Sequence, residues 1–542
     1  MKRLLSSVLL LSTLVCSLIS CSSQVDTSTP EPITFVFYNA DGVEETWSDP
    51  VAKEITRKTG VTLDVDYPVN SDEKRVKLMI ASGEYPDFVF AKGESQSLIE
   101  ARAFIDLTEL IEQYGPNIKK LYGDEFDKLK YSKEDPSIYQ LSSSQVGGEV
   151  ISSSGTAQLQ WAVLKENQYV IPRTLYMYEK AIKTYMQKYQ TINGKDTIGI
   201  SLCCSDWHWY TTLSNPAGFI ANGSPDNGQW IIEDSTYTAN YKTSYEGQKE
   251  YFKWLNQMYD EGILDPEFAT QTNEEYLEKI AEGRVLGIMD ADWNYEKALA
   301  SLKASNQYER TYAGLPVTMN ETIKCSWLMN QGLSVGWGIG ITKACKDPVR
   351  AIKFIDYLCS EEGQILLNWG LEGVNYFVDE EGKRYRTEEE IKNYNEDTGY
   401  KEKTGIEKHR YPFPSYGDHV LDSTGNPYTL ATSMLLDEEY DEEQRAGLKA
   451  WNVRNLIDIF PSNDEFATQE YSPVWTDTLP KEIKNIQDRL DKISWKGLID
   501  CIICSPEQFE EEWSKLQSDL DEAGREKAEQ MLTEYIREEG KK

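Results

Sequence analysis

Cysteine and histidine are scarce in this sequence, and their scarcity limits the chemistry that it supports. The chain has 9 cysteines and 3 histidines among 542 residues. Apart from Cys16 and Cys21 near the start, seven cysteines remain, an odd number that does not fit a disulfide framework. Cys501 and Cys504 form a Cys-x-x-Cys pair, but no second pair or neighbouring histidine completes a metal or redox site. We therefore predict no cofactor and no metal, and we interpret this pair as buried apolar residues on a helix.

Positive charge is also in short supply. Lysine and arginine number 56 against 90 acidic residues, a net charge of −34. Removal of residues 1–20 would delete Lys2 and Arg3 and no acid, leaving 54 against 90, or −36. So acidic a surface argues against nucleic acid and anionic membranes as partners.

Long apolar runs are missing after residue 19, so no later segment is long enough to cross a membrane. The first run follows Lys2 and Arg3 and spans Leu4 to Ile19, which predicts a secretory signal rather than a membrane helix. It ends in Leu-Ile-Ser-Cys at 18–21, which resembles the lipobox of bacterial lipoproteins, where cleavage precedes the cysteine and its sulfur receives a diacylglycerol. The alternative is an ordinary secretory signal with an incidental cysteine. We expect attachment through Cys21 to the outer face of the cytoplasmic membrane.

The remaining chain has the composition of a folded protein. Hydrophobic residues make up 40% and aromatic residues 11%, and the length suits two lobes rather than one core. Strands are predicted at 33–39, 61–66 and 86–91, with helices starting at Asp49-Pro50 and near residue 71 between them. This β-α-β-α-β order implies parallel strands, and such sheets bind ligands beyond the carboxyl ends of the strands. Asn39 and Asp41 follow the first strand and Glu94 follows the third, so we expect these side chains near a ligand or, equally, solvated in loops.

Tryptophans supply a second group of candidates. A sugar ring has apolar faces and a rim of hydroxyls, which aromatic planes and a few fixed polar groups recognise. Trp293 follows the apolar strand VLGIM (285–289), and in DWHWYTT (206–212) strand alternation would place Trp207 and Trp209 on one face, in the core or lining a cleft. Trp337, between two glycines, is assigned to a hinge strand or the core.

Several segments together resemble the family-one bacterial extracellular solute-binding proteins, the carbohydrate-type receptors of ABC importers. These segments are SGEYPDFVF (82–90), FIDLTELIEQY (104–114), QWAVLKENQYVIP (160–172), GRVLGIMDADWNY (283–295), GWGIGITKACKDPVRAIKFIDYLCSEEGQ (336–364) and WGLEGVNY (369–376). The fifth is the most specific, because it joins a returning strand to a helix that ends in Ser-x-Glu-Gly. The last is similar to a loop of the long lipoprotein subtype, which includes alginate-binding proteins.

The resemblance implies the α/β class and a periplasmic-binding-protein fold, in which two α/β lobes joined by a multi-strand hinge close on a ligand in the cleft between them. Residues 1–20 are then a lipoprotein signal peptide, and 21–32 are the lipidated cysteine and a flexible tether. We expect lobe 1 to comprise 33–150 plus about 340–400, and lobe 2 to comprise 151–339 plus about 401–542. Residues 380–445, charged and irregular, are expected to form surface insertions.

The resemblance also implies a function: a monomeric receptor, not an enzyme, that captures an oligosaccharide and delivers it to ABC permease subunits. The expected ligand residues are Asn39, Asp41, Glu94, Trp207, Trp209, Trp293, Trp369, Glu372 and Tyr376. Trp293 ranks first, because it lies where family members keep a stacking tryptophan. Some long members carry a calcium loop, but residues 189–201 offer only Asn193 and Asp196 as side-chain oxygens, so we expect no metal there.

Two other classes of protein stay open at this point. A lipid-anchored glycoside hydrolase is the main alternative, since paired carboxylates can be hidden among 90 acidic residues. A purely structural surface lipoprotein is the third.

Overall fold

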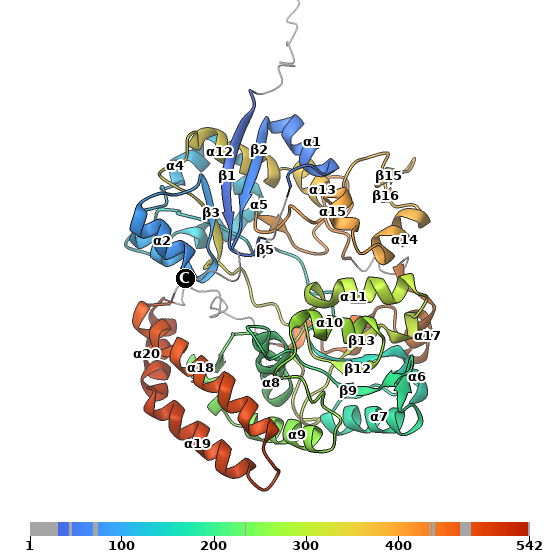
Figure 1. Cartoon of the computed structure of the whole chain (residues 1–542). Helices are drawn as coiled ribbons and strands as arrows, with labels where there is room; N and C mark the ends of the chain where they lie inside the picture. The colour runs from blue at the N-terminus through green and yellow to red at the C-terminus, as the bar shows by residue number, and fades with distance from the viewer. Residues whose placement is uncertain are drawn as a thin grey trace, which may run out of the picture.

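Two β-sheets, each in its own lobe, organise the computed structural model of the chain (Figure 1). The structure describes residues 31–42, 46–68, 74–233, 235–432, 435, 439–466 and 479–539. The predicted signal peptide, Cys21 and most of the tether lie outside the described residues. Within the described ranges, no helix combines the length and the apolar character needed to cross a membrane.

The first lobe is built around a five-stranded sheet. Its strand order is β2 (Val61–Asp66), β1 (Ile33–Asn39), β3 (Phe88–Phe90), β14 (Gly338–Ile341), β4 (Leu141–Ser142). β1 pairs in parallel with β2 and β3, whereas β14 runs antiparallel between β3 and β4. With α1 (Pro50–Thr59) and α2 (Arg75–Ser82) between the first strands, the predicted β-α-β-α-β order is confirmed.

The helix ends of the first lobe follow from local chemistry. The Asp49 carboxylate accepts the amide of Ala52 at 2.8 Å, Pro50 opens α1, and Gly60 closes it in the left-handed region at φ 71°. Asp347 caps α12 (Pro348–Cys359) in the same way, as the Asp-Pro pair predicts.

The second lobe is built around a four-stranded sheet. Its order is β13 (Tyr312–Leu315), β6 (Ala157–Gln160), β12 (Val285–Ile288), β9 (Ile198–Ile200). β12 and β9 are parallel, and β6 is antiparallel to both of its neighbours. Helices surround this sheet and the strand β11 (Thr238–Tyr241). They are α6 (Trp161–Glu166), α7 (Leu175–Lys188), α9 (Gln248–Asp260), α10 (Asn273–Ala281), α11 (Asp292–Ala304), α18 (Lys481–Ile503), α19 (Phe509–Glu522) and α20 (Arg525–Glu539).

Two large hydrophobic clusters mark which parts of the chain pack together. One draws on residues 35–146 and 333–435, and the other on 157–325 and 459–536. The predicted division placed the chain from about 401 onward in lobe 2, but Ile406, Phe413 and Leu430 are buried in the first cluster. Residues 406–432 and Leu435 therefore belong to the first lobe, because their apolar side chains complete its core.

Two of the segments that cross between the lobes lie side by side. The indole nitrogen of Trp327 donates to the Ser152 carbonyl at 2.6 Å. Gly155 has φ 84°, and a Cβ there would lie 2.3 Å from the Trp327 ring, so the close approach requires glycine. The predicted multi-strand hinge is wrong for these two segments, since 147–156 and 326–337, both fully described, carry no strand.

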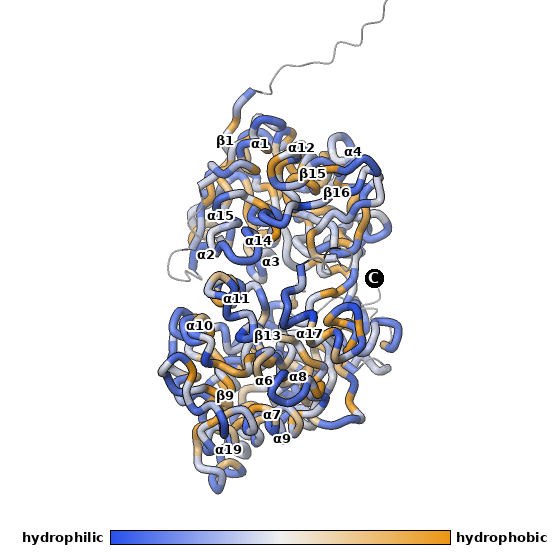
Figure 2. Tube along the Cα trace, turned by 90° about the vertical axis from the view of Figure 1, so that its right-hand side faces the viewer, coloured by the Kyte–Doolittle hydropathy of each residue, from blue (hydrophilic) through white to orange (hydrophobic). Residues whose placement is uncertain are grey.

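The lobes also meet along α11. In Figures 1 and 2, α11 lies beneath α14 (Glu388–Glu396), and α15 (Tyr400–Thr404) belongs to the same region of the first lobe. Lys297 pairs with Glu402 at 3.0 Å, and Lys401 pairs with Glu296 at 2.8 Å. The segment predicted to be a surface insertion thus bridges the two lobes.

Candidate functional site

The facing edges of the two lobes carry four of the nine candidate side chains, namely Asp41 and Glu94 on the first lobe and Trp207 and Trp293 on the second. β1 and β2 run toward the second lobe in Figure 1, and α11, which follows β12, lies on the side of the second lobe nearest the first. Because β9 and β12 are parallel, their carboxyl ends lie at one edge, where residues 201–209 and 289–293 continue the chain. Each lobe thus presents loops to the other.

Two exposed tryptophans form a platform on the second lobe. Trp207 is 49% exposed and Trp293 is 54% exposed, although tryptophan side chains are on average highly buried. Their rings are nearly parallel, with an interplanar angle of 14° and 6.0 Å between centroids. Trp293 is the second residue of α11, and Trp207 stacks in turn on the His208 ring at 3.9 Å. Two parallel exposed rings offer an apolar surface that suits the faces of a sugar.

Polar groups surround this platform. Ser152 donates to Asp292 at 3.0 Å, and the Asp206 carboxylate accepts from the His208 ring at 2.6 Å. Asp290, two residues after the end of β12, is fully buried and accepts from Asn294 at 2.7 Å. Burial raises the pKa of Asp290 to about 7.

The first lobe contributes a charged and aromatic group at its edge. Asp41 pairs with Lys92 at 2.7 Å and accepts from the Tyr411 hydroxyl at 2.9 Å. The Lys92 ammonium lies 4.6 Å from the centre of the Trp337 ring. Burial, with Asp41 beside the hydroxyl, raises the pKa of Tyr411. Asn39 is buried, and its side-chain oxygen accepts the Asp41 amide at 3.0 Å, so it shapes the loop rather than facing a ligand.

Three residues of the candidate site were not predicted from the sequence: Lys92, Trp337 and Tyr411. Lys92 directly precedes Gly93 and Glu94 in the loop after β3, and Glu94, half-buried in the 3-10 turn Lys92–Glu94, lies in that same loop. Trp337, assigned to a hinge strand or the core, packs partly against the first cluster and partly beneath Lys92. Tyr411 comes from a distant segment and stacks edge-on against Phe90, a contact that no local pattern signals.

Trp209 does not accompany Trp207. The chain turns after residue 205 and continues as a π-helical turn at Tyr210–Ser214, so the predicted strand alternation is wrong. Trp209 is 2% exposed and stacks on Trp495 of α18 with an interplanar angle of 2°. It is a core residue and not part of the exposed platform.

The third predicted ligand loop, at 369–376, packs its aromatic rings into the core of the first lobe. Trp369 is 1% exposed, donates to the Pro427 carbonyl at 3.0 Å and packs edge-on against Tyr376. The Arg384 guanidinium covers the Trp369 ring at 5.1 Å. Tyr376 is buried with it, and Glu372 is exposed on the same loop. The assignment of Trp369 and Tyr376 as ligand residues is therefore wrong, since their rings complete the first core.

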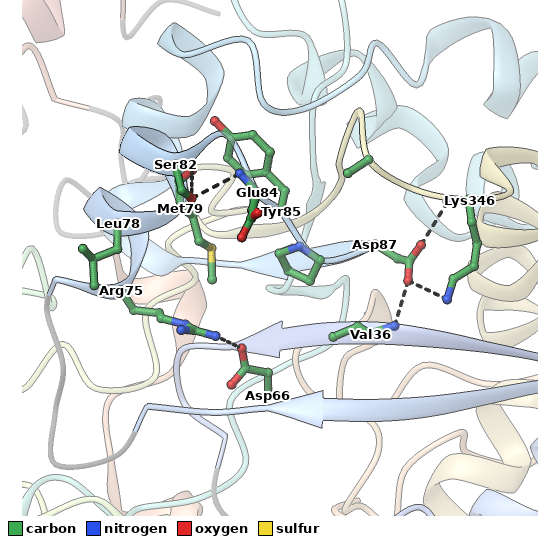
Figure 3. A pocket seen from close by; sticks show the side chains of 12 residues that line it. Val36, Asp66, Arg75, Leu78, Met79, Ser82, Glu84, Tyr85, Asp87 and Lys346 are labelled. Atoms are coloured by element: carbon green, nitrogen blue, oxygen red, sulfur yellow. Dashed lines mark hydrogen bonds and ion pairs between the residues drawn. The ribbon is translucent and has the colours of Figure 1, made fainter.

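A separate cavity of about 630 Å³ lies in the first lobe (Figure 3). Asp66 pairs with Arg75 across it, and Asp87 accepts the Val36 amide at 2.8 Å and approaches Lys346. All of its walls come from the first lobe, and none of the predicted ligand residues, each of which the structure describes, lines it. It is not a site between the lobes.

Comparisons with known proteins agree with this architecture. Residues 51–370 match the family model described as bacterial extracellular solute-binding protein. Lipoprotein LipO of Bacillus subtilis (strain 168) is 23% identical over 345 residues, 60% of this chain and 64% of that protein. The fructooligosaccharide ABC transporter substrate-binding protein FusA of Streptococcus pneumoniae is 23% identical over 304 residues, 51% of this chain and 56% of that protein. The matched regions thus cover less than two thirds of the length of these curated relatives.

Solved structures share the fold over nearly the whole chain. FusA in complex with kestose has a TM-score of 0.67 at 16% identity, covering 94% of this chain and 99% of that one. Alginate-binding protein AlgQ2, solved without calcium ion, has a TM-score of 0.64 at 18% identity, covering 93% and 98%. At this level of identity the likeness shows the fold, and the predicted two-lobe α/β fold is confirmed.

Proposed function

Since the chain belongs to the bacterial extracellular solute-binding proteins, we propose that it captures an oligosaccharide outside the cell and delivers it to an ABC-type permease. The observation that carries this proposal is the exposed parallel pair of Trp207 and Trp293 on the second lobe. The printed names of FusA, a fructooligosaccharide substrate-binding protein, and of AlgQ2, an alginate-binding protein, support the class of ligand.

The two facing edges divide the recognition chemistry between them. Trp207 and Trp293 supply apolar planes for sugar faces, while Asp41 and Lys92 supply an acceptor and a donor for hydroxyls. Glu94 belongs to the same loop as Lys92 and is assigned as a further acceptor. A closing motion would bring both groups onto one ligand and exclude water from it.

The proposal extends to location and partners. Lipidation of Cys21 would attach the protein to the outer face of the cytoplasmic membrane, as a monomer without nucleic-acid partners. The net charge of −34 is consistent with the latter. Replacing Cys21 with serine is expected to abolish lipid labelling and to release the protein from the membrane fraction. Unchanged labelling of that variant would rule out this anchor.

The direct test uses the platform. A first screen of the full chain in detergent would seek ligands by thermal shift among kestose, alginate oligosaccharides and mannose–N-acetylglucosamine glycans, because a ligand at 100 Kd adds about 2.7 kcal/mol of stability. For the best ligand, Trp293→Ala and Trp207→Ala are each expected to weaken binding by about 2 kcal/mol, roughly thirtyfold in Kd, in calorimetric titrations.

Tyr176 provides a matched control. Like Trp293 it is the second residue of a helix, in this case α7, and its side chain is 69% exposed. Tyr176→Ala should leave Kd unchanged. Normal affinity in Trp293→Ala together with a much lower melting temperature would show that the ring serves stability and would contradict the stacking role. Shortening of the glycan during incubation would instead favour a glycoside hydrolase.

A further inference from the structure

Three side chains with metal-binding atoms converge beneath the tryptophan platform. Cys203, Asp206 and His208 follow β9, and the thiol sulfur, a carboxylate oxygen and a ring nitrogen all lie within 4.8 Å of one another. The Cys203 and His208 side chains are buried, whereas the Asp206 side chain is 45% exposed. The cluster is therefore enclosed on two sides and reachable from solvent on the third.

The three ligand atoms lie close to, but not at, the spacing of one tetrahedral ion. With bonds of about 2.0 Å to nitrogen and oxygen and about 2.3 Å to sulfur, the ligand atoms of a zinc site lie about 3.3–3.8 Å apart. The Asp206 oxygen and the His208 Nδ1 atom are 2.6 Å apart, so they need to separate by about 0.7 Å to meet one ion. The Cys203 sulfur lies within 4.8 Å of both the Asp206 oxygen and the His208 nitrogen.

The donor set selects the class of ion. A thiolate, an imidazole and a carboxylate suit zinc and its neighbours among the transition metals, whereas calcium and magnesium prefer oxygen ligands alone. A thiolate and a carboxylate carry two negative charges, which a divalent cation neutralises. This balance matters because an uncompensated charge beside a buried thiol is costly.

The surroundings hold the ligands in place. The Cys203 amide donates to the Thr212 hydroxyl oxygen at 3.1 Å. The Asp206 oxygen that faces the ring also accepts the His208 backbone amide at 3.0 Å. Such outer contacts orient metal ligands in known sites.

We propose that Cys203, Asp206 and His208 bind a thiophilic divalent cation of the zinc class, with a fourth position open to water. Binding releases the thiol proton to the solvent and fixes the His208 ring. Because Trp207 stacks on that ring at 3.9 Å, the ion would also set the position of the platform.

The neighbouring cysteine provides a matched control. Cys203 packs in a small cluster with Tyr276 and Ile280, whereas Cys204 is buried in the large core of the second lobe. The two thiols therefore point to opposite sides of the chain. Cys204→Ser removes a buried thiol of the same loop without removing a proposed ligand.

The test is a titration of the full chain, freed of metal with a chelator, with Zn²⁺ and with Co²⁺. We expect one ion per chain and a thiolate-to-cobalt charge-transfer band in the wild type, in Cys204→Ser and in the Cys501→Ser/Cys504→Ser double variant. Cys203→Ser should lose the band, and its zinc affinity should fall more than about 100-fold, because even outer contacts of metal ligands contribute about 10–100-fold. Asp206→Asn should keep the band with weaker affinity.

Three results would overturn the proposal: no stoichiometric binding by the folded wild type, a band that persists in Cys203→Ser, or a band lost in the Cys501→Ser/Cys504→Ser variant. If Cys203→Ser does not fold, Asp206→Asn decides, since unchanged zinc affinity in that variant would exclude the site.

Discussion

Asp491 is the buried acid that ties α18 to the body of the second lobe. Its two carboxylate oxygens accept the hydroxyls of Tyr241 at 2.8 Å and Tyr210 at 3.1 Å. Burial raises the pKa of Asp491 to about 6, so the folded protein binds this proton more tightly than the unfolded chain does. The neutral carboxyl is thus the form that the fold prefers.

This preference predicts a pH dependence of stability. The stabilisation from the Asp491 proton is complete below about pH 4 and is lost as the pH rises through about 6. Relative to Asp491→Asn, the free energy of unfolding of the wild type should fall by about 2–3 kcal/mol between pH 4 and 7. Denaturant unfolding of both proteins across this range measures the difference.

Asp500→Asn on the same helix is the control, because Asp500 pairs with Lys496 near the surface. Its difference from the wild type should stay nearly constant with pH. A flat difference for Asp491→Asn as well would mean that the carboxyl ionises freely in the fold.

For single residues, the sequence predicts the kind of side chain in the candidate site better than it predicts which of these side chains are exposed. Trp293 was predicted on the loop after β12 and is exposed, and Trp207 was named with it. Trp209 was named on the same ground but lies in the core, because the chain turns where alternation assumed a strand. Exposure of a ring depends on packing partners such as Trp495, which is distant in the sequence.

Among the helices, α11 connects the candidate site to the contact between the lobes. It begins with Asp292 and Trp293 at the platform and continues along α14 and α15. Just beyond it, the Tyr308 hydroxyl donates to Glu396 of α14 at 2.9 Å. Burial and this carboxylate raise the pKa of Tyr308 to about 12.

Loss of the Tyr308 hydroxyl should loosen the lobes. A hydrogen bond to a charged partner contributes about 1.5–3 kcal/mol, so Tyr308→Phe shifts the ligand-free protein toward more open arrangements. Ligand affinity should fall about tenfold, because the ligand then supplies more of the closing free energy. Calorimetry and small-angle scattering of the ligand-free variant check this.

Tyr189→Phe is the matched control, since its hydroxyl bonds Glu166 at 3.2 Å within the second lobe alone. An equal loss of affinity in the two variants would argue against a role of the lobe contact.

Helices and strands with clear caps and periodicity were predictable, but the segment around 380–445 was not. The first turn of α14 carries Glu388, Glu389 and Glu390, which reads as solvated surface. The apolar residues that place the segment, such as Ile406 and Phe413, are few and far apart. The local sequence pattern therefore does not indicate which lobe's core these apolar residues complete.

For the whole molecule, the order of strands and helices predicted an α/β sheet, and the two-lobe fold was implied by the family resemblance of segments spread along the chain. The site was predictable only in part, because its first-lobe half draws on Asp41, Lys92 and Tyr411, which come from three distant stretches. Their meeting depends on the completed sheet and on the return of the chain near residue 411.

Two lobes joined by crossing segments predict a closing motion. The ligand identified by thermal shift should reduce the radius of gyration in small-angle scattering, because it contacts both lobes only when they approach. Trp293→Ala, saturated with the same ligand, should show a smaller reduction. A tightly bound ligand that leaves the scattering curve unaltered would contradict closure while leaving binding intact.

The position of β14 has a consequence for biosynthesis. This strand lies between β3 and β4, yet residues 143–337 separate it from β4 in the chain. A polypeptide exported from its N-terminus therefore presents β3 with an unpaired edge while the complete sheet of the second lobe, from β6 to β13, emerges. The sheet that is begun first is thus completed last, and its open β3 edge stays free to pair until residue 341 has emerged, although the core of the second lobe still awaits residues 459–536.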